Sequence, residues 1–187
     1  MGTRGFVGFV IGGVEKIGYV HSDAYPGGVG LDVLEWLRGV GDLAVLAEEA
    51  DALTVVHDGR KPTPEEIERL KPWTNLGVGE QSEESWYCLL RATQGEPGEI
   101  LRAGFIEDAD DFPTNSLHAE WGYIVDLDAS TFEVYKGFQK APPTAGRFAD
   151  RPGRENGYYP AALVGSWPLT ELPGHDDFVN ALEPSDG

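Results

Sequence analysis

Apolar residues alternate with small or polar residues over the first part of the chain. Val7 and Phe9 lie between small residues, a Gly-Gly pair follows, and a second alternating run ends at His21. Alternation on both sides of a two-residue glycine turn is typical of a β-hairpin. The pattern therefore predicts an N-terminal hairpin with strands over residues 5–11 and 15–21.

A helical period replaces this alternation further along the chain. Apolar residues recur at helical spacing over 31–40, and the pattern continues in "LAVLAEEADA" behind Asp42, which is placed to cap a second helix. The Leu-Thr-Val-Val that follows is also compatible with a strand. Further helices are expected behind Thr63 and Ser82 as caps, and a short one ends at Gly104.

The period returns to two after the acidic loop "FIEDADDFPTN". Strands are expected over 121–127 and 132–137 with a turn at Asp128, followed by a strand in "AALVGSWPL" and a helix capped near Asp176. Two groups of strands separated by helices predict an α+β fold.

We therefore expect an antiparallel sheet, made of the N-terminal hairpin, the C-terminal hairpin and the strand after it. Helices from residues 31–93 are expected on one face of this sheet. The sequence shows no internal repeat and no interdomain linker, so residues 1–187 are expected to form a single domain.

Net charge narrows the choice of partners. The chain has 14 basic and 32 acidic residues, a formal net charge of −18. Such a field repels phosphates and anionic membranes, so we expect neither direct nucleic-acid binding nor membrane binding. The acids are spread along the chain, which suits either a surface for a basic protein partner or a solubilising surface. A single cysteine, Cys88, indicates a buried thiol in a reducing cytoplasm.

The loop before the helix at 31–40 is rich in glycine. Backbone N–H groups at such a helix start can bind an anion, with Arg4 as a possible counter-charge. The alternative is a structural corner, in which glycines hold positive φ. No Walker or dinucleotide motif is present, and we expect no cofactor. The candidate ligand residues in this loop are Tyr25, Gly27, Gly28 and Gly30.

Two histidine-x-carboxylate pairs stand at predicted strand ends. They are His21 with Asp23, and His118 with Glu120. Period two places each pair on one face of its strand, so neighbouring strands would bring the four side chains together for general acid–base chemistry or a metal ion. Nothing in their spacing requires a metal, and we assign no metal ligands.

The start of the chain offers a second catalytic possibility. N-terminal nucleophile hydrolases begin with Cys, Ser or Thr on a first strand, and Thr3 is the only such residue at this point. Using Thr3 in this way would require the removal of Met1 and Gly2.

Two stretches carry a family resemblance. The chain opens with M-G-T-R-G, has D-x-Y-P-x-G-x-G from Asp23 to Gly30, and later contains "WGYIVDLDASTFEVYKGFQ". These features resemble small acidic, uncharacterised proteins of actinobacteria and their phages. The resemblance transfers no activity, and it implies a phage- or host-related accessory protein.

Taken together, these features favour a small soluble cytoplasmic protein with a binding or regulatory role, acting through its acidic surface or the loop at 21–30. The alternative is a hydrolase, either metal-dependent through the two histidine-x-carboxylate pairs or N-terminal-nucleophile-like through Thr3.

Overall fold

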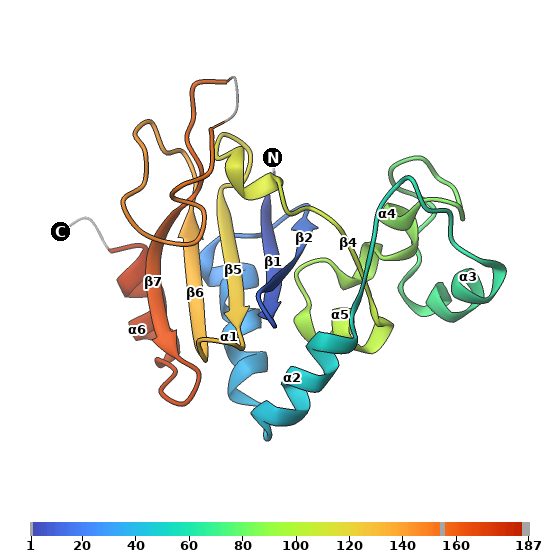
Figure 1. Ribbon diagram of the computed structural model, residues 1–187, viewed down its shortest axis with the longest axis horizontal. Coiled ribbons are helices and arrows are strands. Elements are labelled where there is room, and N and C mark those ends of the chain that lie inside the picture. The colour runs from blue at the N-terminus through green and yellow to red at the C-terminus, as the bar shows by residue number, and fades with distance from the viewer. Residues whose placement is uncertain (1, 154–155, 185–187) are drawn as a thin grey trace.

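A five-stranded sheet forms the centre of the described chain. The computed structural model describes residues 2–153 and 156–184, and within them the strand order is β2-β1-β5-β6-β7 (Figure 1). The strands of this sheet are β1 (Gly5–Ile11), β2 (Val14–Val20), β5 (Trp121–Asp126), β6 (Thr131–Lys136) and β7 (Ala162–Pro168). A second, two-stranded sheet pairs β3 (Thr54–Val56) with β4 (Phe105–Glu107). The predicted α+β class and both hairpins are confirmed.

The sheet is mostly antiparallel, as predicted, but one pair of neighbouring strands is parallel, which was not expected. β1 and β5 run parallel, with Gly5 opposite Trp121 and Val10 opposite Asp126. The other neighbouring pairs of this sheet are antiparallel. Alternation and turn residues determine how strands pair within a hairpin. They carry no information on the direction in which two hairpins far apart in sequence meet.

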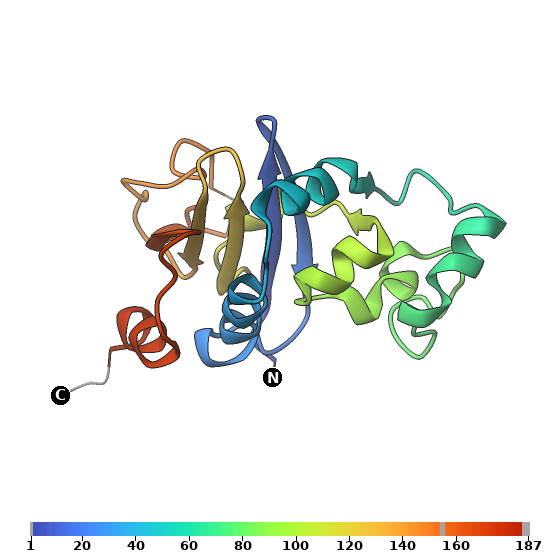
Figure 2. The ribbon, with the colours of Figure 1, turned by 90° about the horizontal axis from the view of Figure 1, so that it is seen from below.

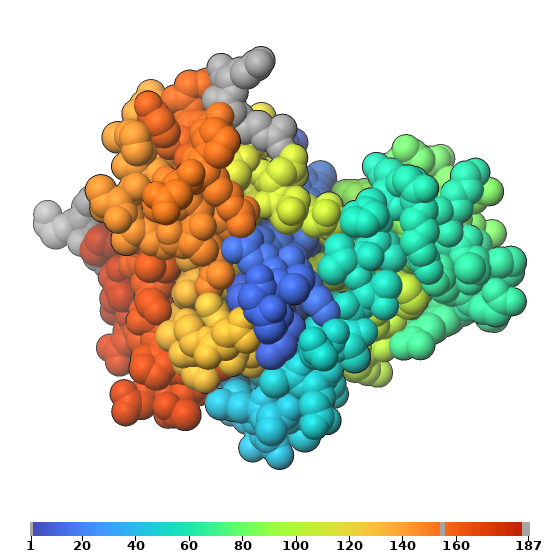
Figure 3. All heavy atoms as spheres, in the orientation of Figure 1, coloured from blue at the N-terminus to red at the C-terminus, as the bar shows by residue number. Residues whose placement is uncertain are grey.

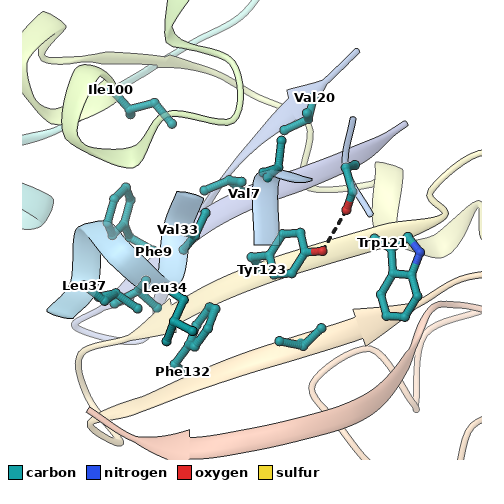
Figure 4. Packing of buried hydrophobic residues seen from close by; sticks show 14 of the residues in the cluster. Val7, Phe9, Val20, Val33, Leu34, Leu37, Ile100, Trp121, Tyr123 and Phe132 are labelled. Atoms are coloured by element: carbon teal, nitrogen blue, oxygen red, sulfur yellow. Dashed lines mark hydrogen bonds between the residues drawn. The ribbon is translucent and has the colours of Figure 1, made fainter. Parts of the chain in front are cut away.

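Helices cover one face of the sheet, as expected. These are α1 (Leu31–Arg38), α2 (Leu43–Ala52), α5 (Pro97–Ala103) and α6 (His175–Leu182). Their apolar residues join the sheet's inward side chains in one buried cluster, part of which is drawn in Figure 4. The opposite face is covered by a loop through Phe148 and Ala161, and this loop and α6 lie on opposite sides of the sheet (Figure 2).

The segment between α2 and α5 departs from the prediction. α3 (Pro64–Leu70) and α4 (Trp86–Leu89) form a separate apolar cluster with β3, including Val56, Leu70 and Trp86, instead of packing on the large sheet. This part protrudes at the right of Figure 3. Because α1, α2, α5 and α6 already cover this face of the sheet, the segment between α2 and α5 buries its apolar residues, including Trp86, in a cluster of its own.

Local capping signals predicted helix starts better than helix lengths. Asp42 caps α2 by accepting from the Ala44 N–H at 2.8 Å, and Thr63 forms a capping box with Glu66. The helix expected behind Ser82 is only the single turn of α4, because the Ser82 hydroxyl accepts from Glu84 N–H in a local turn. α6 begins after Gly174, so Asp176 lies in its first turn and is not its cap.

Two further observations concern the short strands and the length of the helices. The Leu-Thr-Val-Val tail does contain a strand, β3, and the acidic loop begins with β4, which was not expected. Within the described residues, every helix is too short or too polar to cross a lipid bilayer.

The parallel pairing also joins the two hairpin turns. Gly12 and Gly13, with φ of 59° and 74°, form the first turn. Their N–H groups each donate to the Asp128 carboxylate at 2.8 Å, and Asp128 lies in the turn between β5 and β6. One carboxylate therefore connects residues more than a hundred positions apart.

We expect Asp128→Ala to lower the free energy of unfolding by about 1–2 kcal/mol, because two backbone donors lose a charged acceptor. Urea unfolding followed by circular dichroism measures this change. Glu48→Ala, which removes one exposed negative charge from α2, is the matched control and should have little effect. Equal stability of the two variants would show that the bridge between the turns contributes nothing.

Candidate ligand-binding groove

The strand arrangement brings four chain segments to one edge of the sheet. β1 and β5 both begin there, because Gly5 lies opposite Trp121. Their antiparallel partners end at the same edge, since Val20 pairs with Gly5 and Lys136 pairs with Trp121. Residues just before β1 and β5 therefore lie beside residues just after β2 and β6.

A hollow of about 580 Å³ opens at this edge. We refer to it as the strand-start groove, and it is lined by Gly2, Thr3, Arg4, His21, His118, Glu120 and Phe138. The groove thus combines one arginine, two imidazoles, one carboxylate and one aromatic ring. Concave sites with a few polar groups beside an apolar surface are the usual form of ligand sites.

Backbone hydrogen bonds position the charged side chains of the groove. Glu120 N–H donates to the Arg4 carbonyl oxygen at 3.0 Å, and Arg4 N–H donates to Glu120 Oε1 at 3.4 Å. The segments before β1 and β5 are therefore held together beyond the sheet itself. His21 Nδ1 lies 3.1 Å from the hydroxyl of Tyr19, which is two residues back on β2.

Phe138 is the most unusual residue of the groove. It is 50% exposed and has φ of 57°, a conformation that bulky residues rarely adopt. Its N–H donates to the Ser116 carbonyl oxygen at 2.7 Å, and a β-carbon on the preceding Gly137 would lie 2.1 Å from the Ala119 carbonyl oxygen. Strained conformations of this kind concentrate at functional sites. No pattern in the sequence pointed to Phe138.

Three of the four histidine and carboxylate candidates meet in this groove. His21, His118 and Glu120 line it, whereas Asp23 does not. The expected geometry was wrong, because β1 lies between β2 and β5, and the chain has already left β2 at His21. Asp23 has φ of 59°, so strand alternation does not apply to it.

These candidates do not form a metal site. In the part of the chain that the structure describes, no three His, Cys, Asp or Glu side chains are grouped so that they could hold a metal ion. The metal-dependent form of the hydrolase hypothesis therefore has no geometric support.

The glycine-rich loop is a corner whose backbone donors are largely occupied. Val29 N–H donates to the Asp23 carbonyl oxygen at 2.8 Å, and the N–H groups of Gly28 and Gly30 both donate to the carbonyl oxygen of Tyr25. The loop closes into a π-helical turn, Pro26–Gly30, that leads directly into α1. These three donors are not available to an anion, and of the proposed ligand residues only Arg4 lines the groove.

The glycines of this corner are required for space, and the expectation of positive φ was wrong. Gly28 and Gly30 have φ of −104° and −57°. A β-carbon on Gly28 would lie 2.4 Å from the Asp23 carbonyl oxygen, and one on Gly30 would lie 2.8 Å from the Tyr123 hydroxyl oxygen. That hydroxyl donates to the Ala24 carbonyl oxygen at 2.7 Å, the dashed line in Figure 4, and so anchors the corner to β5.

Thr3 also lines the groove, and its carbonyl oxygen accepts from the Ala24 N–H at 3.1 Å. The N-terminal nucleophile hypothesis depends on removal of Met1 and Gly2, and Met1 lies outside the described residues.

A second group of acidic residues lies away from the groove. Burial, followed by the neighbouring Asp58 and Glu80 carboxylates, raises the pKa of Glu107 on β4 to about 7. Shifts of this size occur at active sites and in structural clusters alike. Among the described residues, these carboxylates are not arranged so that they could hold a metal ion. The raised pKa of Glu107 does make the stability of the fold depend on pH.

Comparison with known proteins adds no constraint, since no family model, no curated protein and no solved structure matches this chain.

We expect Gly28→Ala and Gly30→Ala each to lower the free energy of unfolding by about 1–3 kcal/mol, because the added methyl group meets backbone or ring atoms. Gly27→Ala is the matched control, since its β-carbon would lie 3.7 Å from the Tyr25 ring, an ordinary contact. Thermal unfolding measures the difference. A Gly27→Ala variant as unstable as the other two would contradict the steric explanation.

Glu107 makes stability depend on pH in a defined direction. Its pKa is about 7 in the folded protein against an ordinary value of 4.5, so the folded state binds more protons between these two values. This contribution to stability is present at acidic pH and is lost as pH rises towards 7. We expect Glu107→Gln to stabilise the protein at pH 8 by on the order of 1 kcal/mol and to flatten the profile between pH 4.5 and 7. Urea unfolding across this range, with Glu48→Gln as control, tests it; a variant with the wild-type profile would contradict it.

Proposed function

We propose that this protein is a binding or regulatory protein, and that its ligand or partner occupies the strand-start groove. The observation that supports this most strongly is the convergence of Arg4, His21, His118 and Phe138 from four separate segments on one hollow. Chemically diverse side chains gathered in this way supply hydrogen bonding, charge and apolar contact together.

Phe138 gives the proposal a specific test. An exposed ring in a strained backbone conformation adds little to folding, which favours a role for Phe138 in contact with a ligand. The rest of the groove can then fix the orientation of whatever the ring contacts.

We expect Phe138→Gly to separate stability from binding. Glycine removes the ring and tolerates the positive φ, so the free energy of unfolding should stay within about 1 kcal/mol of the wild type or rise. Binding should be lost. The immobilised protein is exposed to a lysate of the source organism and to its small-molecule extract, and retained species are identified by mass spectrometry.

The matched control is Val14→Ala, which shortens an exposed apolar side chain at the opposite end of β1 and β2. Species held by the groove should be retained by the wild type and by Val14→Ala and lost from Phe138→Gly. The same species on all three proteins, or no retained species on any of them, would argue against a ligand in the groove.

A hydrolase is the second candidate, favoured by the placement of Thr3 beside both histidines in the same groove. An N-terminal nucleophile needs a free amine next to its hydroxyl. Intact mass of the protein from its source should then show the loss of Met1 and Gly2. A mass that retains both residues would exclude this mechanism.

A further inference from the structure

Two hollows lie along one side of α2, and they share no lining residue with the strand-start groove. The first, of about 260 Å³, opens between α2 and the end of α1, and the second, of about 290 Å³, opens between the end of α2 and the α5–β4 segment. Glu49 lines both, so the hollows adjoin at this residue. We refer to them together as the α2 groove. The residues that α2 and its two caps contribute to it are Asp42, Val45, Leu46, Glu49, Ala52 and Leu53.

The lining residues of α2 follow the spacing of a single helical stripe. Val45, Leu46 and Glu49 lie three, four and seven positions after Asp42, and positions 52 and 53 continue the same series. Residues at this spacing share one side of an α-helix. The groove therefore runs along the whole of α2, whose ten residues give it a length of about 15 Å.

Apolar side chains form much of the α2 groove. Leu46 and Leu53 are buried, whereas Val45 on the same stripe is 49% exposed. The apolar residues that line the groove from other elements are Trp36, Val40, Leu101 and Phe105. The apolar side of α2 is thus only partly covered by the fold. An elongated groove of this kind is the form in which proteins bind the apolar face of an amphipathic helix.

Charge decides between a partner protein and a second copy of this chain. Residues 39–59 contain no lysine or arginine. Their carboxylates are Asp42, Glu48, Glu49, Asp51 and Asp58. Among the described residues that line the groove, the basic one is Arg69, whose guanidinium lies 5.9 Å from the centre of the Phe105 ring. Pairing α2 with α2 of a second copy would place like charges face to face, whereas a basic helix meets opposite charges.

We propose that the α2 groove binds an amphipathic, basic helix of a partner protein. The apolar face of that helix contacts Val45 and the apolar side chains around it, and its lysine or arginine residues lie beside Asp42 and Glu49. This surface is separate from the strand-start groove, and the inference goes beyond the function proposed for that groove.

A synthetic peptide of leucine and lysine tests the proposal. The probe is about 15 residues long, which permits a marginally stable helix, and its leucines recur at helical spacing so that they share one face. Titration calorimetry at about 0.15 M salt, where long-range attraction is screened, measures its affinity. We expect saturable binding with a Kd of about 100 μM or tighter.

Two control peptides separate the apolar and the charged parts of the recognition. One has the same composition with the leucines scattered around the helix, and the other has glutamate in place of lysine. Each should bind at least about tenfold more weakly than the probe.

Val45→Asp distinguishes binding in the groove from general attraction between opposite charges. The change removes an exposed apolar side chain and adds a negative charge in the first turn of α2, where an acid favours the helix. Binding in the groove should weaken by at least about tenfold, whereas attraction by charge alone would strengthen. Val164→Asp is the matched control, since it places the same charge on an exposed valine of the edge strand β7. This variant should keep at least the wild-type affinity.

Glu49→Lys tests the carboxylate that both hollows share, and it keeps the proposal testable should Val45→Asp fail to fold. We expect it to weaken binding of the probe by about tenfold. Glu171→Lys, which reverses an exposed charge after β7, is the control for the same change in net charge. Circular dichroism checks that each variant is folded.

Equal affinity for the peptide with scattered leucines, or unchanged affinity in Val45→Asp and Glu49→Lys, would overturn the proposal. Sedimentation of the protein alone tests the other occupant, because a wild-type dimer that Val45→Asp dissociates would assign the groove to a second copy. Failure of the function proposed for the strand-start groove gives a different result. The protein would then bind the probe through the α2 groove while no captured species depended on Phe138.

Discussion

The parallel pairing of β1 with β5 is the constraint on which the candidate site depends. It places the starts of both strands at one edge of the sheet, so residues before them become neighbours. An antiparallel pairing of the same two strands would put His118 and Glu120 at the opposite edge from Arg4 and His21. At the far edge the same pairing brings Asp128 to the N–H groups of Gly12 and Gly13. One choice of strand direction therefore produces both the groove and the bridge between the two hairpin turns.

The loop that follows Phe138 is held on the sheet by ion pairs. Arg147 binds Asp126 at 2.5 Å and Glu133 at 3.0 Å, and so holds the loop that follows Phe138 against one face of the sheet. The carboxylates hold the pKa of Arg147 above its ordinary value even though burial acts in the other direction. A loop fixed at both ends can impose an unfavourable φ on a residue at its start. Arg147 is therefore committed to structure, whereas Arg4 lines the groove.

The helices and strands could be predicted from the sequence, but the tertiary contacts between them could be predicted only in part. Asp42 and Thr63 marked helix starts correctly because capping depends on a few adjacent residues. Three members of the histidine pairs do meet in one groove, although they meet across β1 and without Asp23. Phe138 and Tyr19 could not be found, because backbone strain and burial exist only in the folded chain. The glycines at 28 and 30 were recognised as necessary, but their steric reason depends on Tyr123 and on the folded loop.

Tyr19 connects these observations to a chemical property of the groove. Its ring packs edge-on against Phe112, with centroids 5.1 Å apart, so the hydroxyl has a fixed position. Burial raises its pKa, and the phenol therefore remains protonated near neutral pH. When this hydroxyl donates to Nδ1 of a neutral His21, the imidazole proton is carried by Nε2. His21 then presents an N–H donor in the same groove as Arg4, so a ligand there meets two donors from segments that only the parallel pairing of β1 with β5 brings together with His118 and Glu120.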